Sequence, residues 1–261
     1  MKTILADLHI HTALSPCASR QMLPRTIVQT CMDRGLTMIA ICDHNSAANV
    51  YAVAEAARRE SGETLKVVPG IEVTTREEVH VLGLFPALEG ALAVGESILE
   101  TLPGDGRAEE PSNPIEASPD SGQWILDWEG RRTATERRLL TAASGYGLEE
   151  AVDLIRRHGG FAVAAHVDRR AFSVLGQLGF FPETPRFLAA EISAAGVARM
   201  RKGELQIEKV RAHDLPLISG SDSHNLEEIA CSCTAFLIAE PCFAELVLAI
   251  KGIGSRRCHI A

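Results

Sequence analysis

The residues that most constrain the fold are the first eleven, Met-Lys-Thr-Ile-Leu-Ala-Asp-Leu-His-Ile-His, in which an apolar run leads into two histidines. Successive side chains of a strand point to opposite faces, so we expect His9 and His11 on one face and Leu8 and Ile10 on the other. A turn containing Pro16 follows. The stretch therefore predicts a buried first strand whose carboxyl end carries two convergent imidazoles, at the end where α/β barrels place their chemistry.

Apolar runs and amphipathic stretches alternate along most of the chain. The runs predict further strands at residues 36–42, 65–68 with 71–73, 79–85, 161–165, 188–192, 217–219 and 235–238. The stretches between them predict helices at 23–34, 47–60, 148–158, 172–178, 206–213 and 243–251. Pro69 and Gly70 are expected to interrupt the third strand. Such alternation is typical of parallel strands joined by helical crossovers, and the expected fold class is α/β.

Composition limits the class of protein. A chain of 261 residues, 46% of them hydrophobic, can bury a sizeable core. It has no apolar run of about 18 residues, and its start lacks the cleavage site of a secretory signal, so we expect a cytoplasmic protein that does not enter membranes. Its seven irregularly spaced cysteines are expected to be reduced. A formal net charge of −8 without a basic stripe predicts no binding of long nucleic acid.

Residues 86–145 interrupt the alternation. After an apolar helix candidate at 91–102, the segment 103–122 is rich in proline, glycine, serine and acidic residues and is typical of a loop or a disordered chain. Residues 123–140 predict a small hairpin followed by a helix. We interpret 86–145 as an insertion between the two parts of one barrel domain, residues 1–85 and 146–261. Arginines at 131, 132, 137 and 138 make the insertion a possible substrate lid, and we expect Trp124 and Trp128 to pack it onto the barrel.

Histidines recur where the predicted strands end. Six of the nine histidines fall at or just beyond such an end, and two carboxylates accompany them. The set comprises His9, His11, His44, His80, His166, His224, Glu72 and Asp222. Parallel strands would bring all eight to one end of a barrel. So many ligands indicate two or three divalent ions, and a nitrogen and oxygen donor set suits Mn, Fe or Zn. Adjacent ions can activate a water molecule against a phosphoryl centre, so the expected reaction is hydrolysis of a phosphate ester.

Five motifs occur in a fixed order: DLHIH at 7–11, CDHN at 42–45, GIEVTT with EVHVLGL between 70 and 84, AAHVDR at 164–169 and SGSDSHN at 219–225. In order and type they resemble the PHP family, whose members are metal-dependent phosphoesterases. The resemblance implies a distorted (β/α)7 barrel of TIM-like form with a trinuclear metal site. It assigns His9, His11, Glu72 and Asp222 to a first ion, Glu72, His80 and His166 to a second, and His44 and His224 to a third.

The stretch after the first motif departs from the family pattern. Family members of this type usually read Ser-Asp-Gly, with the aspartate on the third ion, whereas this chain reads Ser15-Pro16-Cys17. Proline offers no ligand atom. Either Cys17 replaces the carboxylate as a thiolate ligand, or the third site is weak or empty. The structural alternative is that Cys17 is a small buried turn residue.

Three further residues are candidates beside the metal ligands. Arg169 follows the fourth motif and resembles the family's phosphate-holding arginine, a role that suits a guanidinium fork. Arg20, after the first motif, is a second candidate for binding the substrate. Asp7, two residues before His9, would lie on the same face and is expected to orient a ligating imidazole. Asp43 is adjacent to a ligand but would face away from it.

The preferred hypothesis is hydrolysis of a phosphate monoester of a small nucleotide or related metabolite, by attack of a metal-bound hydroxide. A phosphodiesterase or exonuclease acting on short oligonucleotides is the first alternative. A phosphatase of the histidinol phosphate kind is the second. The rival from another class is a PHP module that binds metal without catalysis, although such modules usually lose ligands.

Overall fold

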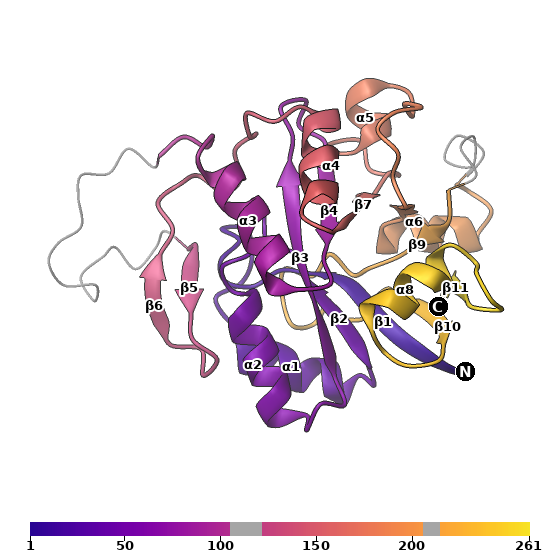
Figure 1. The fold of residues 1–261 in the computed structure, drawn as a ribbon, viewed down its shortest axis with the longest axis horizontal. Coiled ribbons are helices and arrows are strands. Elements are labelled where there is room, and N and C mark those ends of the chain that lie inside the picture. Colours follow the sequence, from indigo (N-terminus) through magenta and orange to yellow (C-terminus); the bar gives the residue numbers. More distant parts are fainter. Residues whose placement is uncertain (105–121, 206–214) are drawn as a thin grey trace, which may run out of the picture.

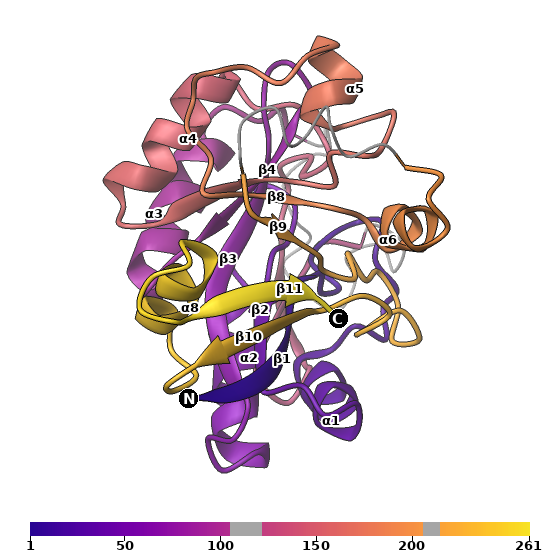
Figure 2. The same cartoon turned by 90° about the vertical axis from the view of Figure 1, so that its right-hand side faces the viewer.

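The computed structural model describes residues 1–104, 122–205 and 215–261, and within these ranges nine strands form one sheet that curves into a barrel (Figures 1 and 2). Their order across the sheet is β11-β10-β1-β2-β3-β4-β7-β8-β9. The strands are β1 (Lys2–Ile10), β2 (Met38–Ile41), β3 (Lys66–Thr74), β4 (His80–Leu84), β7 (Phe161–Ala164), β8 (Ala189–Glu191), β9 (Leu217–Ile218), β10 (Thr234–Ile238) and β11 (Arg257–Ile260). The helices are α1 (Pro24–Asp33), α2 (Val50–Glu60), α3 (Leu88–Leu99), α4 (Leu148–Arg157), α5 (Val174–Leu178), α6 (Ala194–Arg201) and α8 (Phe243–Ile250). The helix predicted at 206–213 lies outside the described residues.

The two ends of the sheet approach each other and nearly close the barrel. Ile10, at the end of β1, forms a parallel bridge with Ser223 beyond β9. The hydroxyl of Thr234, on β10, accepts the backbone N–H of Ser219 at 2.7 Å and donates to its carbonyl at 2.9 Å. These bonds join the loop after β9 to β1 and β10, so the predicted α/β fold, a distorted barrel, is confirmed.

The third strand is continuous, unlike the prediction. β3 runs through Pro69 and Gly70. The strand changes partners at this point: its residues up to Pro69 pair with β2, and those from Gly70 onward pair with β4. A Cβ atom on Gly70 would lie 2.6 Å from Sγ of Cys42 and 2.8 Å from the carbonyl oxygen of Ile41. Glycine therefore permits the close approach of β2 and β3 rather than breaking the strand.

The fourth strand has the opposite direction to the one predicted. β4 pairs antiparallel with both β3 and β7, whereas β1, β2 and β3 are mutually parallel, as are β7, β8 and β9. The connection from Thr74 to His80 is too short for a helical crossover, which needs a dozen or more residues. Because β4 is reversed, its first residue, His80, lies at the end of the barrel where the parallel strands finish. The histidines therefore still meet.

Apolar side chains pack on both faces of the sheet. One cluster lies between the strands and helices α1 to α4, with Ile27 and Val94 among its fully buried members. The other, on the opposite face, joins Leu82 of β4 to Leu246 of α8. In the described ranges no helix is long and apolar enough to cross a bilayer. A cytoplasmic location stays a prediction from the sequence.

The region interpreted as an insertion contains one helix of the barrel layer and one hairpin. Helix α3 buries Val94 in the same core as α4, whereas β5 (Trp124–Leu126) and β6 (Arg132–Thr135) form a separate two-stranded sheet, drawn at the left of Figure 1. The ring of Trp128 lies under Arg59 of α2 at 4.4 Å, so the hairpin packs onto the barrel. No helix follows β6 before residue 145, contrary to the prediction. Most of the predicted loop at 103–122 lies outside the described residues, and the domain division at 86 and 145 stays a prediction.

Candidate metal centre

The end of β1 brings its two histidines together although the strand is irregular there. The register of β1 against β2 shifts between Asp7 and Ile10, and Leu8 and Ile10 pack in different apolar clusters rather than on one face. Nevertheless the Nε2 atoms of His9 and His11 lie 3.2 Å apart, and both residues are fully buried. The two imidazoles therefore converge as predicted. Leu8 and Ile10, however, do not share the face that the strand pattern predicts for them.

A glutamate outside the motifs fixes the first histidine. Glu191 ends β8 and is 1% exposed, and its carboxylate oxygens lie 3.0 and 3.2 Å from Nδ1 of His9. Oε2 also accepts the backbone N–H of His166 at 3.1 Å. Glu191 thereby leaves Nε2 of His9 directed at the cluster. The sequence carried a signal that was missed, since an acidic residue within the apolar run 188–192 needs a buried partner.

The second histidine is held by a network around Asp43. Nδ1 of His11 lies 2.9 Å from the hydroxyl of Ser15, which donates to Asp43 at 2.7 Å. Asp43 also accepts the backbone N–H and the hydroxyl of Thr12, at 2.7 and 2.8 Å. The Ser15 hydroxyl accepts the backbone N–H of His44 at 3.1 Å. Asp43 therefore positions two histidines through the loops after β1 and β2 without bonding to either imidazole.

One carboxylate lies at the centre of the imidazoles. Glu72 of β3 is fully buried, and both of its oxygens face ring nitrogens. Oε1 lies 2.9 Å from Nδ1 of His80, 3.1 Å from Nε2 of His166 and 3.4 Å from Nε2 of His9. Oε2 lies 2.9 Å from Nδ1 of His44 and 3.4 Å from Nε2 of His11. A carboxylate in this position can bridge two cations.

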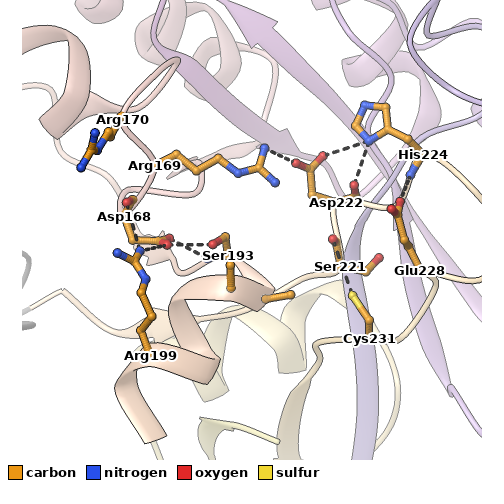
Figure 3. Close-up of a pocket in the computed structure, with 12 residues that line it drawn as sticks. Asp168, Arg169, Arg170, Ser193, Arg199, Ser221, Asp222, His224, Glu228 and Cys231 are labelled. Carbon is orange, nitrogen blue, oxygen red and sulfur yellow. Dashed lines mark hydrogen bonds and ion pairs between the residues drawn. The ribbon is translucent and has the colours of Figure 1, made fainter. Parts of the chain in front are cut away.

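Asp222 closes the cluster from the loop after β9. Its Oδ1 lies 3.0 Å from Nε2 of His11 and 3.3 Å from Nε2 of His9, and its carbonyl oxygen lies 2.9 Å from Nδ1 of His224. Oδ2 pairs with Nη1 of Arg169 at 2.6 Å (Figure 3). The φ of Asp222 is 51°, a left-handed conformation that costs energy for a residue with a Cβ and is concentrated at functional sites.

An exposed aromatic residue covers His80. The ring of Phe172 stacks on the imidazole of His80 with centroids 4.7 Å apart, and the carbonyl of Phe172 accepts the backbone N–H of His80. Phe172 has a φ of 57° and is 42% exposed, an unusual combination for a bulky apolar side chain. Its position in the chain suggested only the start of a helix, so sequence reasoning missed it.

The electrostatics of the cluster suit cations. Burial would lower the pKa of His9, but the carboxylates of Glu191, Asp222 and Glu72 raise it well above its usual value. Burial likewise opposes ionisation of Glu72, yet the surrounding imidazoles hold the pKa of that carboxyl well below its usual range. Burial lowers the pKa of His11 strongly, so its imidazole is neutral and offers a lone pair. Protons on the imidazoles thus balance the buried carboxylates, and a divalent ion would take the place of those protons.

In the described part of the chain, ligand atoms gather in three sets whose members lie within 4.8 Å of one another. The sets are His9 with His11, Glu72 and Asp222; His44 with Glu72 and His80; and His11 with His44 and His224. The first set has the same four residues that the family resemblance assigns to the first ion. The second set contains His44, whereas the resemblance assigns His166 to the second ion beside Glu72 and His80. Among the described residues, Nδ1 of His166 is buried without a hydrogen-bond partner, and Nδ1 of His44 and Oε2 of Glu72 lie 2.9 Å apart without the geometry of a hydrogen bond. The donors present therefore fit divalent cations.

Cys17 lies at the edge of the third set. Partial burial of the sulfur would raise the pKa of its thiol, but hydrogen bonds with the imidazoles of His224 and His44 lower it to about 7. The residue is exposed and lines the cavity above Glu72. It is therefore not a buried turn residue, and its thiol faces two of the imidazoles of that set.

Asp7 does not orient an imidazole, contrary to expectation. Its Oδ1 accepts the backbone N–H groups of Ser221 at 2.9 Å and His9 at 3.4 Å, and its Oδ2 accepts that of Ala230 at 2.9 Å. Asp7 thus ties the loop after β9 to β1. The orienting role predicted for it is filled by Glu191, because the ring of His9 turns toward β8.

The described contacts of Arg20 and of the arginines of the hairpin region are with other parts of the protein than the cavities at the cluster. The guanidinium of Arg20 lies 5.4 Å from the centre of the Trp124 ring. Arg131 pairs with Glu129, and Arg138 donates to a backbone carbonyl. Within the described part of the chain, none of these arginines lines the cavities at the cluster. A substrate role for Arg20 and a lid role for the insertion stay predictions without support from these contacts.

Two cavities meet at the cluster. The smaller, of about 260 Å³, lies over the imidazoles and is lined by Cys17, His44, Glu72, Thr74, His80, Thr141 and Phe172. The larger, of about 600 Å³, is lined by Asp168, Arg170, Ser193, Ala194, Ala195, Arg199, Ser221, Glu228 and Cys231 (Figure 3). Arg169, Asp222 and His224 line both. The cluster is therefore accessible from a space much larger than a single phosphate group needs.

The sequence profile of the PHP domain matches residues 7–183. The chain belongs to the PHP family. A second profile, described as PHP-associated, matches residues 207–252. The family expected from the motifs is thus confirmed, and with it the class of hydrolases that act on phosphate esters.

The curated relatives and similar structures include nucleases. The 5'-3' exoribonuclease Rnm of Salmonella typhimurium is 27% identical over 198 residues, which are 64% of this chain and 66% of that protein. The protein of the same name from Escherichia coli is 31% identical over 84 residues, 31% of this chain and 27% of that protein, so the chain spans less than two thirds of either.

The lesion-specific endonuclease EndoQ of Pyrococcus furiosus has a TM-score of 0.64 at 18% identity, covering 98% of this chain and 58% of that chain. Endonuclease Q in complex with a 27-mer duplex containing an abasic lesion has a TM-score of 0.66 at 17% identity, with the same coverage. These structural likenesses show the fold.

The expectation that long nucleic acid is excluded is wrong. It is contradicted by relatives named as exoribonucleases and by a structural neighbour bound to duplex DNA. The expectation rested on net charge, which sums the whole surface, whereas binding of phosphates depends on the charges at the cleft. Three arginines, Arg169, Arg170 and Arg199, line the larger cavity of this acidic chain.

Proposed function

We propose that the protein is a metal-dependent phosphodiesterase that shortens a nucleic-acid strand from one end, the activity named for its exoribonuclease relatives. The observation that carries the proposal is the joined pair of cavities. The imidazole and carboxylate cluster borders the smaller cavity, and Arg169 stands where that cavity meets the larger, arginine-lined one. A small phosphate monoester would need only the smaller cavity, so the monoester hypothesis becomes the second candidate.

Arg169 is the residue placed to hold the reacting phosphate. Its Nη1 pairs with Asp222, and the side chain is 44% exposed, so the guanidinium borders both cavities. A planar guanidinium donates to two phosphate oxygens at once and stays charged at any physiological pH. Such a donor stabilises the negative charge that develops on the phosphoryl oxygens in the transition state.

The cofactors of this proposal are two or three divalent ions, with Mn, Fe or Zn the candidates. The proposed ligands are the eight predicted residues, His9, His11, His44, Glu72, His80, His166, Asp222 and His224. When bound, the ions would supply Lewis acidity and a nucleophilic water at neutral pH. The protein's part is to keep ring nitrogens directed at the cluster, through Glu191 for His9 and through the Asp43 network for His11.

Cys17 is proposed as the ligand that replaces the family's aspartate in the third set. A thiol whose pKa lies at about 7 is present in substantial part as the thiolate at neutral pH, and the thiolate is the form that binds metal. Loading with Co²⁺ tests this independently of activity, because a thiolate ligand gives a near-ultraviolet charge-transfer band. We expect the band in the wild type and in a Cys242→Ser control, and its loss in Cys17→Ser. An unchanged spectrum in Cys17→Ser would leave the third set without a thiolate.

The function is tested with protein loaded with Mn²⁺ and RNA oligonucleotides labelled at either end. We expect products that shorten one nucleotide at a time from a single end. The His80→Ala variant should lose this activity with an unchanged circular dichroism spectrum, and His259→Ala, an exposed histidine on β11, serves as the matched control. Hydrolysis confined to mononucleotides and p-nitrophenyl phosphate would restore the monoester hypothesis. Full activity of His80→Ala would remove the proposed metal mechanism.

A further inference from the structure

The larger cavity continues away from the imidazole cluster. Figure 3 shows Asp222 and His224 at one side of it and Arg170 and Arg199 at the other, with Arg169 reaching between them. Its volume of about 600 Å³ falls in the range of cavities that bind nucleotide-sized ligands. The reacting phosphate occupies only the Arg169 end, so the far end of the cavity is left without a ligand.

The arginines at the far end have donors to offer. Arg199 of α6 pairs with Asp168 through Nη2 at 2.8 Å, its side chain is 44% exposed, and both of its hydrogen bonds come from that one nitrogen. Arg170 is exposed, and within residues 1–104, 122–205 and 215–261 its side chain makes no ion pair. Two guanidinium groups at one end of a cavity are suited to an anion with several oxygens, such as a phosphodiester.

The acidic residues that line the cavity are already engaged. Oδ1 of Asp168 accepts the backbone N–H of Ser193 at 2.7 Å, and Oδ2 accepts the hydroxyl of the same residue at 2.7 Å. Glu228 accepts the backbone N–H of His224 at 3.0 Å, on the side away from Arg170 and Arg199. The Asp168 carboxylate thus holds the start of α6 and fixes Arg199, and the free arginine nitrogens remain for a ligand.

We infer that this end of the cavity is a subsite for the phosphate next to the reacting one in a single-stranded nucleic acid, with Arg170 and Arg199 as its ligands. The inference rests on the proposed function and deepens it, because it states how a strand is distinguished from a mononucleotide. A strand whose reacting phosphate lies at Arg169 extends its next phosphodiester toward these two arginines. A phosphate monoester without a second phosphate gains nothing from them.

Binding of a hydrolysis-resistant phosphorothioate tetraribonucleotide to the metal-loaded protein tests the subsite, with a mononucleotide as the comparison ligand. The variants are Arg170→Gln and Arg199→Lys, the latter keeping the charge beside Asp168 while removing the planar fork. Arg157→Gln is the matched control, since Arg157 is exposed at the end of α4, which leads into the opposite end of β7. Fluorescence anisotropy gives the dissociation constants and their dependence on salt concentration.

We expect Arg170→Gln to weaken tetramer binding about tenfold, the size of one charge-assisted hydrogen bond, and to reduce the slope of log K against log salt by about 0.7. Arg199→Lys should weaken it several-fold, and mononucleotide binding should not change in either variant. Unchanged tetramer binding, an equal loss for the mononucleotide, or an equal loss in Arg157→Gln would overturn the subsite. A wild type that binds the tetramer tightly but fails to cleave the natural phosphodiester would overturn the proposed function and leave the subsite standing.

Discussion

Replacing Glu191 with Gln tests whether the buried contacts behind the cluster set its affinity for metal. Glu191 is 1% exposed and accepts from Nδ1 of His9 at 3.0 Å and from the backbone N–H of His166 at 3.1 Å, both at Oε2. Glutamine has the same shape but one acceptor oxygen, so even with that oxygen in the Oε2 position its amide NH₂ replaces Oε1, which lies 3.2 Å from the Nδ1 donor of His9. An unsatisfied buried donor costs about 1–3 kcal/mol. Loss of a hydrogen-bonded partner behind a ligating histidine typically costs 10–100-fold in metal affinity, or about 1.4–2.7 kcal/mol.

The assay is a competition between the protein and a chelating dye for Zn²⁺ or Mn²⁺, combined with thermal unfolding of the metal-free protein. We expect Glu191→Gln to weaken the tightest site by at least tenfold and to lower Tm by several degrees, at about 2–4 °C per kcal/mol for a chain of this size. Glu149→Gln, on the exposed face of α4, should change neither. A lower Tm with unchanged metal affinity would refute the reasoning. Glu191 would then stabilise the fold without affecting how His9 binds metal.

Three further outcomes follow from the structure. Phe172→Ala should raise KM for RNA about tenfold and leave KM for p-nitrophenyl phosphate unchanged, since loss of one base-stacking ring costs about 1–3 kcal/mol; equal effects on both substrates would mean that the ring serves only His80. Leu82→Ala should lower the free energy of unfolding in urea by about 3–4 kcal/mol, because Leu82 is fully buried between packed elements; a loss below about 1 kcal/mol would contradict close packing there. Hydrogen bonds from Arg256 lower the pKa of Glu245 from 4.5 to about 2, so their stabilisation is present above pH 4.5 and is lost as the pH falls through 2. Unfolding of Glu245→Gln should therefore depend less on pH between these values, and an unchanged profile would show that the pair adds nothing.

The sequence predicted the convergence of the histidines by a route that was partly wrong. It assumed that every strand is parallel and grouped His80 with the histidines at strand ends, although His80 lies at the start of the predicted strand 79–85. His80 instead begins an antiparallel strand, and the two differences cancel. The residues between Thr74 and His80 already excluded a parallel crossover on grounds of length. Loop length was therefore the more reliable guide to strand direction, whereas the periodicity of apolar residues reported only that a strand was present.

The residues that support the clustered histidines were harder to predict than the histidines themselves. The histidines recur in short motifs at strand ends, where local sequence fixes their positions. The partner of His9, Glu191, lies 182 residues away, and only the closing of the barrel brings the two together. Asp43 lies within a motif, but its contact with Ser15 depends on how two loops fold against each other. Local pattern can mark a buried acid as needing a partner, but the identity of the partner comes from tertiary structure.

Asp222 explains how an acidic chain can present a cleft that suits anions. Its Oδ1 faces His11 inside the cluster, and its Oδ2 holds Arg169 at the junction of the two cavities. On the far side, Asp168 holds Arg199 in the same way. The side chains of Asp222 and Asp168 are only 5% and 2% exposed, whereas those of their partners Arg169 and Arg199 are each 44% exposed. The negative charges are therefore buried, and the positive charges are accessible to a bound anion. A net charge of −8 therefore says little about the cleft, because two of the carboxylates that contribute to it, Asp168 and Asp222, orient arginines there.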